Sequence, residues 1–395
     1  MHSLSLLLGL LALSTTSLAA PFVPLYTYRG QIKPGSYIVK LQDGSDQTTI
    51  LGFLASLVGA NNEVTHRYSS NFYNAFAGNF DDKSINALML NPNVEYVAQN
   101  GYMSTFDSRN DEPWNLARIS TPNKLSDQDP LDLTNTYNYA SNPGNGVDIY
   151  VVDTGIYTHH EDFEDRARWG KTFCDGCMDA DGNGHGTHVA GTAAGTRFGV
   201  AKSARLIAVK VLDDLGSGMI SDIISGLDYV QQQRKASGRP SIATMSLGGS
   251  YSFPMNDAVT KLINDGIHCT VAAGNSNEDA LTTSPASTPQ AITVGAIDIT
   301  DSRAVYSNYG FIVDIFAPGS NVTSTWNNGG VNTISGTSMA TPAVAGLVAY
   351  YLSTVNPNMT PAEMSNHITS RATSGKLTNI PFLTPNRLAF NSWPA

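Results

Sequence analysis

The sequence contains few charged residues and no cluster of basic ones. Lys, Arg, Asp and Glu make up 14% of the 395 residues, whereas hydrophobic residues make up 41%. Such a composition is typical of a globular protein and excludes a disordered chain. The formal net charge is −10, and Lys and Arg are scattered along the chain. We therefore expect no nucleic-acid partner, because binding to phosphates requires gathered basic side chains.

The sequence also lacks an apolar run long enough to span a membrane. The longest apolar stretch, Leu4 to Leu13, is too short for a span and is followed by small residues. Ser17 and Ala19 fit the small-x-small pattern of a cleavage site. These features predict a signal peptide over residues 1–19 and a secreted, extracellular protein without a membrane segment. In that compartment Asn321 and Asn358, which begin N-x-T sequons, are candidate glycosylation sites.

Cysteine is scarce, with three in the chain, so at most one intramolecular disulfide can form. Cys174 and Cys177 form a CxxC pair that is open to two interpretations, a redox motif or a local disulfide staple. We favour the staple because the thioredoxin-like context, a helix opening after a strand, is absent. Cys269 alternates with apolar neighbours in a strand pattern, which predicts a buried, inert thiol.

The order of predicted elements divides the chain into two parts. Strands expected at 37–41, 74–80 and 94–99, with helices at 48–58 and 83–91, indicate a small domain of mixed type before residue 106. The polar stretch 101–113 lacks periodicity and is typical of an exposed linker. From Val147 onward, Val- and Ile-rich runs alternate with helical stretches. This pattern predicts an α/β fold whose mostly parallel sheet is covered on both faces, with active groups beyond the carboxyl ends of the strands.

The segment 179–190, DADGNGHGTHVA, matches two metal motifs only in part. Its first six residues fit the opening of an EF-hand loop, but the twelfth is Ala190, where a bidentate glutamate is needed. His185 and His188 form an HxxH pair, whereas zinc helices require histidines at i and i+4 plus a third ligand. Both metal interpretations are therefore disfavoured. His185, between two glycines, is left as a candidate base.

Two other residues complete a catalytic pattern with His185. Asp153 ends the apolar strand VDIYVVD, and Ser338 stands at the start of a helix in GTSMATPAVAGL. Each has an ordinary alternative, a turn-capping carboxylate and a helix N-cap. Together they provide an orienting acid, a base and a nucleophile. In the chain order Asp, His, Ser they match the arrangement known from subtilisin.

The segments around these residues resemble a known family. VVDTGI, GHGTHVAGT and GTSMATPAVAGL are similar to the signature blocks of subtilisin-like serine proteases, the peptidase S8 family. EPWNLARIS, KVLDDLGSG, SNYGFIVDIFAPG and TNIPF resemble the secreted fungal proteinase K group within it. The resemblance covers essentially all of residues 107–395. It implies a serine endopeptidase with the three-layer subtilisin-like α/β fold, built on a mostly parallel central sheet and preceded by a small α+β propeptide domain.

The resemblance also implies the roles of further residues. Asn275 in VAAGNSN would donate to the oxyanion together with the backbone N–H of Ser338. The segments that would bind and enclose an extended peptide are Gly216, Ser217, Gly218, Ser246, Leu247, Gly248, Ala272, Ala273 and Gly274. The last three would line a roomy, uncharged pocket for the residue before the cut. We therefore expect broad specificity with a preference for large apolar or aromatic residues at that position.

Residues 20–106 resemble the inhibitor I9-type propeptide of this family through SYIVKL, YNAFAGNF and PNVEYVAQ. The resemblance implies that this domain assists folding and blocks the cleft until it is removed, so that the enzyme is made as an autoprocessed zymogen. We expect cleavage between Phe106 and Asp107, which places Phe106 in the roomy pocket and leaves a peptidase domain of residues 107–395.

The remaining expectations concern calcium, disulfides and partners. No cofactor is implied for catalysis. The resemblance implies one structural Ca²⁺ site at Asp314 with the carbonyls of Pro289 and Ala291, and loss of a second, whose carboxylate position holds Lys376. Two long-range disulfides of the proteinase K group are also missing, and Val189 replaces its free cysteine. The expected partners are protein and peptide substrates and the chain's own propeptide, and we expect a monomer.

Two alternative functions remain open. A catalytically silent peptide binder would keep the fold and the cleft without turning over peptides. An esterase or lipase would carry a GxSxG elbow after a strand, which we do not find, since Ser338 lies in GTSMA.

Overall fold

The structure is a computed structural model that describes residues 23–27, 32–57, 62–68, 73–101 and 106–392. The chain forms two compact units, Met1–Met103 and Ser104–Ala395, each of which is described by itself. The expected signal peptide, residues 1–19, lies outside the described residues.

The first unit is a five-stranded sheet with two helices. The strand order is β1-β5-β2-β4-β3. Its elements are β1 (Leu25–Tyr26), β2 (Ile32–Leu41), α1 (Gln47–Ala55), β3 (Glu63–Arg67), β4 (Ala75–Asn79), α2 (Asp82–Met89) and β5 (Val94–Gly101). Both helices begin after a capping aspartate: Asp46 accepts from two backbone N–H groups at 3.1 Å, and Asp81 from one at 2.8 Å. Apolar side chains from both layers, including Val39, Phe76 and Leu88, form one core.

The strand β3 of this unit has a sequence that does not predict a strand. The strand is polar and largely exposed, and within the described residues it pairs with β4 alone, at the edge of the sheet. It therefore lacks the apolar alternation by which a half-buried strand is recognised.

The second unit is built on a nine-stranded sheet of order β19-β20-β16-β15-β13-β11-β8-β10-β9. Its strands are β8 (Asp148–Asp153), β9 (Ala167–Thr172), β10 (Arg205–Lys210), β11 (Ser241–Met245), β13 (His268–Ala272), β15 (Ile292–Ile297), β16 (Ile315–Pro318), β19 (Thr373–Ser374) and β20 (Arg387–Leu388). Neighbouring strands are parallel apart from the β19–β20 pair. The expected mostly parallel α/β sheet is confirmed.

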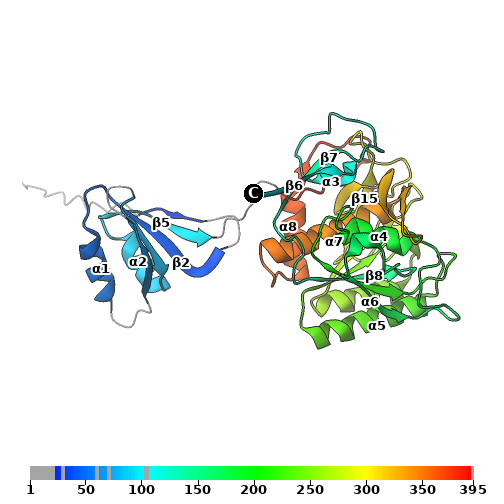
Figure 1. Ribbon diagram of the computed structural model, residues 1–395, viewed down its shortest axis with the longest axis horizontal. Helices are drawn as coiled ribbons and strands as arrows, with labels where there is room; N and C mark the ends of the chain where they lie inside the picture. The colour runs from blue at the N-terminus through cyan, green and yellow to red at the C-terminus, as the bar shows by residue number, and fades with distance from the viewer. Residues whose placement is uncertain (1–22, 28–31, 58–61, 69–72, 102–105, 393–395) are drawn as a thin grey trace, which may run out of the picture. The chain divides into compact units, whose positions relative to one another are not determined.

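Helices cover both faces of this sheet (Figure 1). On one side lie α4 (His185–Ala194) and α7 (Thr337–Thr354), and on the other α5 (Ile220–Ser237) and α6 (Phe253–Asn264). Alternate residues of β8 enter the two cores: Ile149 packs with α4 and α7, and Tyr150 with α5 and α6. Because both faces are buried in the middle of the sheet, central strands such as β8 and β15 consist largely of apolar residues.

The two helices on the first face pack closely against each other. A Cβ at Gly346 of α7 would lie 2.5 Å from the carbonyl oxygen of Ala193 in α4. Only glycine permits the two helices to approach so closely at this point.

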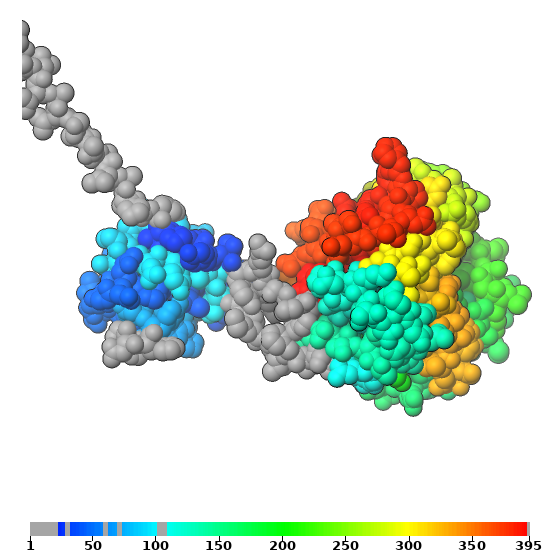
Figure 2. Space-filling view, turned by 90° about the horizontal axis from the view of Figure 1, so that it is seen from above, coloured from blue at the N-terminus to red at the C-terminus, as the bar shows by residue number. Residues whose placement is uncertain are grey.

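Shorter elements surround the sheet. They are β6 (Phe106–Glu112), α3 (Trp114–Ile119), β7 (Asn135–Ala140), a 3₁₀ turn at Glu161–Phe163, β12 (Gly249–Ser250), a 3₁₀ turn at Ala280–Thr282, β14 (Thr283–Ser284), β17 (Val322–Thr325), β18 (Val331–Ile334) and α8 (Pro361–Arg371). The start and end of the unit meet: Asn391 donates from its backbone N–H to the Ile119 carbonyl at 2.8 Å. Figure 2 shows the corresponding teal and red surfaces side by side.

The prediction of an exposed linker over 101–113 was wrong in part. Residues 106–112 form β6, which pairs antiparallel with β7. The sequence pattern does not predict this strand because charged residues hold it in place. Glu112 is fully buried, and its carboxylate accepts a hydrogen bond from Lys202 Nζ at 3.0 Å. Within the described residues, no helix is both long and apolar enough to cross a membrane.

Candidate active site

Asp153 and His185 meet where a strand ends and a helix begins. Asp153 is the last residue of β8 and is fully buried, and His185 is the first residue of α4. Asp153 Oδ1 lies 2.7 Å from His185 Nδ1 and also accepts from the backbone N–H of Thr154 at 2.7 Å. The carboxylate thus fixes the orientation of the imidazole and makes Nδ1 the protonated nitrogen. Nε2 is then available as a base.

The surroundings of His185 favour its charged form. Burial opposes the charge, but the charge and hydrogen bond of Asp153, with the charge of Asp181, outweigh it and raise the pKa of His185 above its ordinary 6.5. His188, one turn along the helix, is different. Burial lowers its pKa to about 3, and Nε2 lies 3.0 Å from the Val322 carbonyl oxygen.

Ser338 lies at the N-terminal end of α7, as the second residue of the helix. Its hydroxyl donates to the carbonyl oxygen of Ser246 at 3.1 Å, and the Ser246 hydroxyl donates back to the Ser338 carbonyl at 2.8 Å. Among the described contacts the hydroxyl has no hydrogen bond to His185. In enzymes without substrate, such catalytic contacts are often long and tighten only when substrate binds.

Asn275 is held by its amide oxygen. Its Oδ1 accepts from the backbone N–H of Thr337 at 2.8 Å and from the Thr337 hydroxyl at 2.9 Å. The amide nitrogen is therefore the end of the side chain that remains to donate. Thr337 directly precedes Ser338, so one residue orients the donor beside the serine.

Two adjoining hollows open at these residues. The first, of ≈ 430 Å³, is lined by His185 and by the segment Gly216, Ser217 and Gly218. The second, of ≈ 460 Å³, is lined by Ser338, Asn275, Ala272 and Gly274. Residues 246–250 line both, so His185, Ser338, Asn275 and most of the expected substrate-binding residues surround one continuous cleft, and Asp153 lies buried behind His185. Ala273 is fully buried behind it.

Comparison with known proteins decides the family. The family model described as "Subtilase family" matches residues 144–385, and "Peptidase inhibitor I9" matches residues 36–106. The chain belongs to the subtilase family. This subtilase is a serine endopeptidase whose peptidase domain follows an inhibitor-type propeptide. The resemblance to proteinase K-type proteases is confirmed.

Two relatives match the subtilase over almost its whole length. It is 44% identical to "Cuticle-degrading protease" of Metarhizium anisopliae over 97% of this chain and 98% of the relative, and 41% identical to "Proteinase R" of Parengyodontium album over 99% of both. Among solved structures, a cold adapted subtilisin-like serine proteinase matches 71% of this chain and 98% of its own with a TM-score of 0.64 and 43% identity. Sphericase matches the same share of this chain with a TM-score of 0.60 and 33% identity.

A charged residue in this pocket was not predicted from the sequence of the subtilase. The hollow beside Ser338 and Asn275 is lined by Glu278 as well as by Ala272 and Gly274. The glutamate is exposed, and no ion pair joins it to a Lys or Arg within the described residues. The expectation of an uncharged pocket rested on glycine and alanine alone. Glu278, three residues after Asn275, was the signal that it left out.

The expected calcium residues lie at one end of β15 and β16. Asp314 is largely buried, and desolvation raises the pKa of its carboxyl to about 6, although Thr293 N–H donates to it at 2.8 Å. A buried carboxylate with this raised pKa suits a bound cation. Ala291 is buried nearby in the chain and Pro289 is exposed. Among the described residues no group of three or more His, Cys, Asp or Glu gathers as a metal site, so calcium would rely on carbonyls and water.

The structure also shows the state of the cysteines and the exposure of the sequon asparagines. Cys174 and Cys177 are joined in a disulfide, and Cys269 is a buried free thiol in β13 whose pKa is raised by desolvation. Asn321 and Asn358 are both exposed. Lys376 is exposed in a loop near the C-terminus.

Proposed function

We propose that this subtilase cleaves peptide bonds through Ser338 as nucleophile, His185 as base, Asp153 as orienting acid and Asn275 as oxyanion donor. The observation that carries the proposal is the 2.7 Å contact between Asp153 and His185 at the edge of the cleft that Ser338 and Asn275 also line.

The chemistry follows from these positions. His185 Nε2 takes the proton as Ser338 Oγ attacks the scissile carbonyl carbon, and the carbonyl oxygen becomes an oxyanion that accepts from Asn275 Nδ2 and the Ser338 N–H. The C–N bond then breaks as His185 gives its proton to the leaving amine. Water, activated by the same histidine, hydrolyses the acyl-enzyme and restores Ser338. No step requires a metal.

Substrate selection is assigned to the two hollows. Residues 216–218 and 246–248 would pair as edge strands with an extended peptide, which recognises the backbone and explains broad specificity. The hollow lined by Ala272 and Gly274 would take a large apolar or aromatic residue before the cut. Glu278 at the same hollow would extend that preference to lysine, whose long apolar stem carries a charge that can reach a carboxylate.

Maturation and location are proposed from the N-terminal part of the chain. The inhibitor I9 match ends at residue 106, next to the expected cut between Phe106 and Asp107, which supports self-cleavage of a zymogen. The predicted signal peptide supports secretion, and exposure of Asn321 and Asn358 makes both sequons accessible to glycosylation. The mature peptidase would act as a monomer on protein substrates and be blocked by its own propeptide.

Calcium is proposed as a structural ion held by Asp314 and the carbonyls of Pro289 and Ala291. Its charge would compensate the buried carboxylate and stabilise the fold. A lower melting temperature in EDTA that is absent in the D314N variant would support this site.

Labelling by a serine-directed phosphonylating reagent tests the proposed function. The full-length chain is expressed, the secreted protein is purified, and its intact mass and modified residue are determined beside the S338A variant. One adduct on Ser338 with loss of peptidase activity is expected, and no adduct on S338A. A folded, processed chain that takes no adduct on Ser338 would contradict the proposal and favour a silent peptide binder.

A further inference from the structure

The acidic turn before His185 holds a carboxylate that the proposed reaction does not use. Asp181, the third residue of DADGNG, is 7% exposed and belongs to no described metal cluster. Its carboxylate accepts five hydrogen bonds, from Thr154 Oγ1 at 2.9 Å, Asn183 N at 3.2 Å, Gly184 N at 2.8 Å, Thr187 N at 3.0 Å and Thr187 Oγ1 at 2.6 Å. So many donors occupy the acceptor sites that a cation would need.

Two of the hydrogen bonds that Asp181 accepts fix the start of α4. The N-cap residue, Gly184, has a φ of 103° and no side chain with which to cap the helix. Asp181 supplies that acceptor from three residues upstream, because it bonds both Gly184 N and the Thr187 N–H of the first turn. The negative charge also suits the positive end of the helix. His185 is the first residue of the turn that is held in this way.

The hydrogen bond from Thr154 connects Asp181 to the end of β8, the strand that carries Asp153. The Thr154 hydroxyl donates to Asp181 Oδ1 and accepts from the backbone N–H of Gly186 at 2.9 Å. The Thr154 backbone N–H donates to Asp153 Oδ1, the oxygen that faces His185 Nδ1. The end of β8 and the start of α4 are therefore joined twice, once by Asp153 with His185 and once through Asp181 with Thr154.

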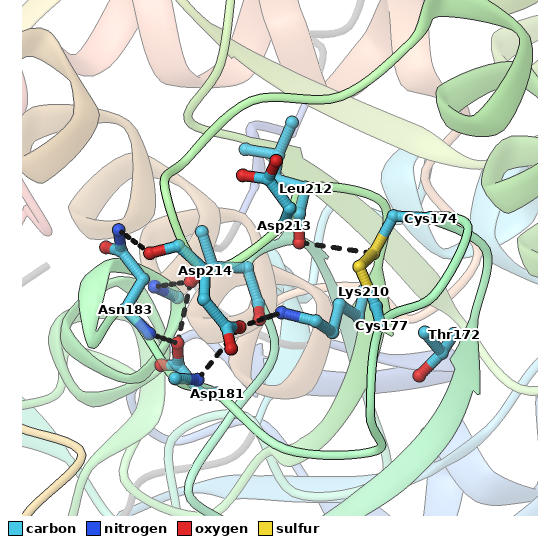
Figure 3. A network of polar contacts seen from close by, with 12 residues as sticks. Thr172, Cys174, Cys177, Asp181, Asn183, Lys210, Leu212, Asp213 and Asp214 are labelled. Carbon is cyan, nitrogen blue, oxygen red and sulfur yellow. Dashed lines mark hydrogen bonds and ion pairs between the residues drawn. A yellow bond between two sulfur atoms is a disulfide. The ribbon is translucent and has the colours of Figure 1, made fainter.

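Figure 3 shows that this carboxylate lies in a wider network of polar contacts. Lys210, fully buried at the end of β10, donates to the Thr154 carbonyl at 2.6 Å and to Asp214 Oδ1 at 2.8 Å. Asp214 in turn accepts from Gly182 N at 3.3 Å, in the turn of Asp181 itself. Thr154 and the turn are thus supported from a second strand.

We propose that Asp181 is a positioning residue of the peptidase, whose carboxylate holds Asp153 and His185 in their mutual geometry through Thr154 and the first turn of α4. The inference rests on the proposed roles of Asp153 and His185. It also explains why an acidic turn that resembles a calcium loop precedes the histidine.

The charge of Asp181 also affects the pH dependence of activity, which a residue with a purely structural role would not change. The charged groups that face His185 are Asp153 from β8 and Asp181 from the turn. His188, behind it on α4, is titratable but neutral, because burial lowers its pKa to about 3. Lys210 and Asp214 form an ion pair of 2.8 Å, so their charges compensate each other. Removing the charge of Asp181 takes away one of the negative charges that raise the pKa of His185. The acid limb of the pH–rate profile then moves to lower pH.

The test compares D181N with D179N, which removes an exposed carboxylate from the same turn. Both are expressed as full-length chains, and kcat, KM and the pH profile are measured on a peptide anilide, with active sites counted by phosphonylation of Ser338. For D181N we expect kcat per active site to fall by about 10–100-fold with KM little changed, because small misplacements of catalytic groups have effects of this size. The acid limb should move to lower pH, and D179N should match wild type.

A second pair of variants tests the same link without touching the turn. T154V removes the hydroxyl between Asp181 and Gly186 at nearly constant volume, and T154S keeps it. T154V should lose kcat as D181N does, T154S should restore it, and the double variant should lose no more than the single ones. If D181N does not fold, T154V and T154S still test whether the contact between Thr154 and Asp181 is needed for catalysis.

Wild-type kcat per active site in D181N or in T154V would overturn the proposal, and so would an acid limb in D181N that does not move. A loss of active-site number alone would overturn it too, because it indicates only reduced folding. Failure of wild-type enzyme to be labelled at Ser338 is a separate result, which would contradict the proposed function rather than the role of Asp181.

Discussion

Asp153 Oδ1 lies 2.7 Å from His185 Nδ1, and the carboxylate that makes this contact is fully buried. The pair fixes the ring tautomer, and its charge contributes to the raised pKa of His185. Because the base must be neutral, activity should appear only above this raised pKa, with an optimum at neutral to alkaline pH.

D153N tests this relationship directly. The amide can present its NH₂ group to Nδ1, which would stabilise the wrong tautomer, so we expect kcat to fall by about 10⁴-fold, the effect known for this substitution in a chymotrypsin-type triad. The acid limb of kcat/KM should also move to lower pH, since the charge that raises the pKa is gone. Steady-state kinetics from pH 5 to 9 measure both, and an unchanged kcat would contradict the assigned role.

N275A should lower kcat by about 10²–10³-fold and leave KM nearly unchanged, the effect known for the side-chain oxyanion donor of subtilisin. The reason is that the donor contacts the oxygen chiefly after negative charge has developed. S276A, which alters the next residue of the same hollow, is the control. A rise in KM with constant kcat would instead place Asn275 in ground-state binding.

E278Q should change selectivity without changing the chemistry. On substrates with lysine before the cut we expect kcat/KM to fall by up to about fivefold, because an exposed ion pair contributes little. Substrates with phenylalanine there should be cleaved at the wild-type rate. E161Q removes an exposed carboxylate elsewhere and controls for net charge. Equal effects on both substrates would show that Glu278 does not contact the lysine.

Two buried histidines should make the fold sensitive to acid. Burial lowers the pKa of His188 to about 3 and that of His268 to about 4, whereas both titrate near 6.5 in the unfolded chain. Below pH 6.5 the unfolded state therefore binds more protons, and the free energy of unfolding falls as the pH drops. At pH 5 each histidine should cost about 2 kcal/mol relative to pH 7.

Denaturant unfolding of S338A, which does not digest itself, measures this effect at pH 7 and pH 5. H268Q in the same background should remove about 2 kcal/mol of the difference between the two pH values. Carboxyls whose pKa is raised, such as that of Asp314, act in the opposite direction but are common to both proteins. An identical pH dependence in the two would show that His268 is not buried in its neutral form.

The sequence alone determined the class of fold, the family and the candidate catalytic residues. Buried parallel strands are recognisable as continuous Val and Ile runs, and Asp153, His185 and Ser338 lie in segments whose local order is distinctive. The strand β6 escaped because pairing with β7 and the buried Glu112–Lys202 contact specify it, with no apolar period.

Only the tertiary structure decided how the site is held and what lines it. Thr154 and Asp181 are 27 positions apart, and Asn275 and Thr337 are 62 apart, so neither contact has a sequence signature. The same is true of Glu278, whose place at the hollow depends on how the loop after β13 lies beside α7. Motifs record local chemistry, whereas hydrogen bonds between distant segments exist only after the strand ends and helix starts have been brought together by packing.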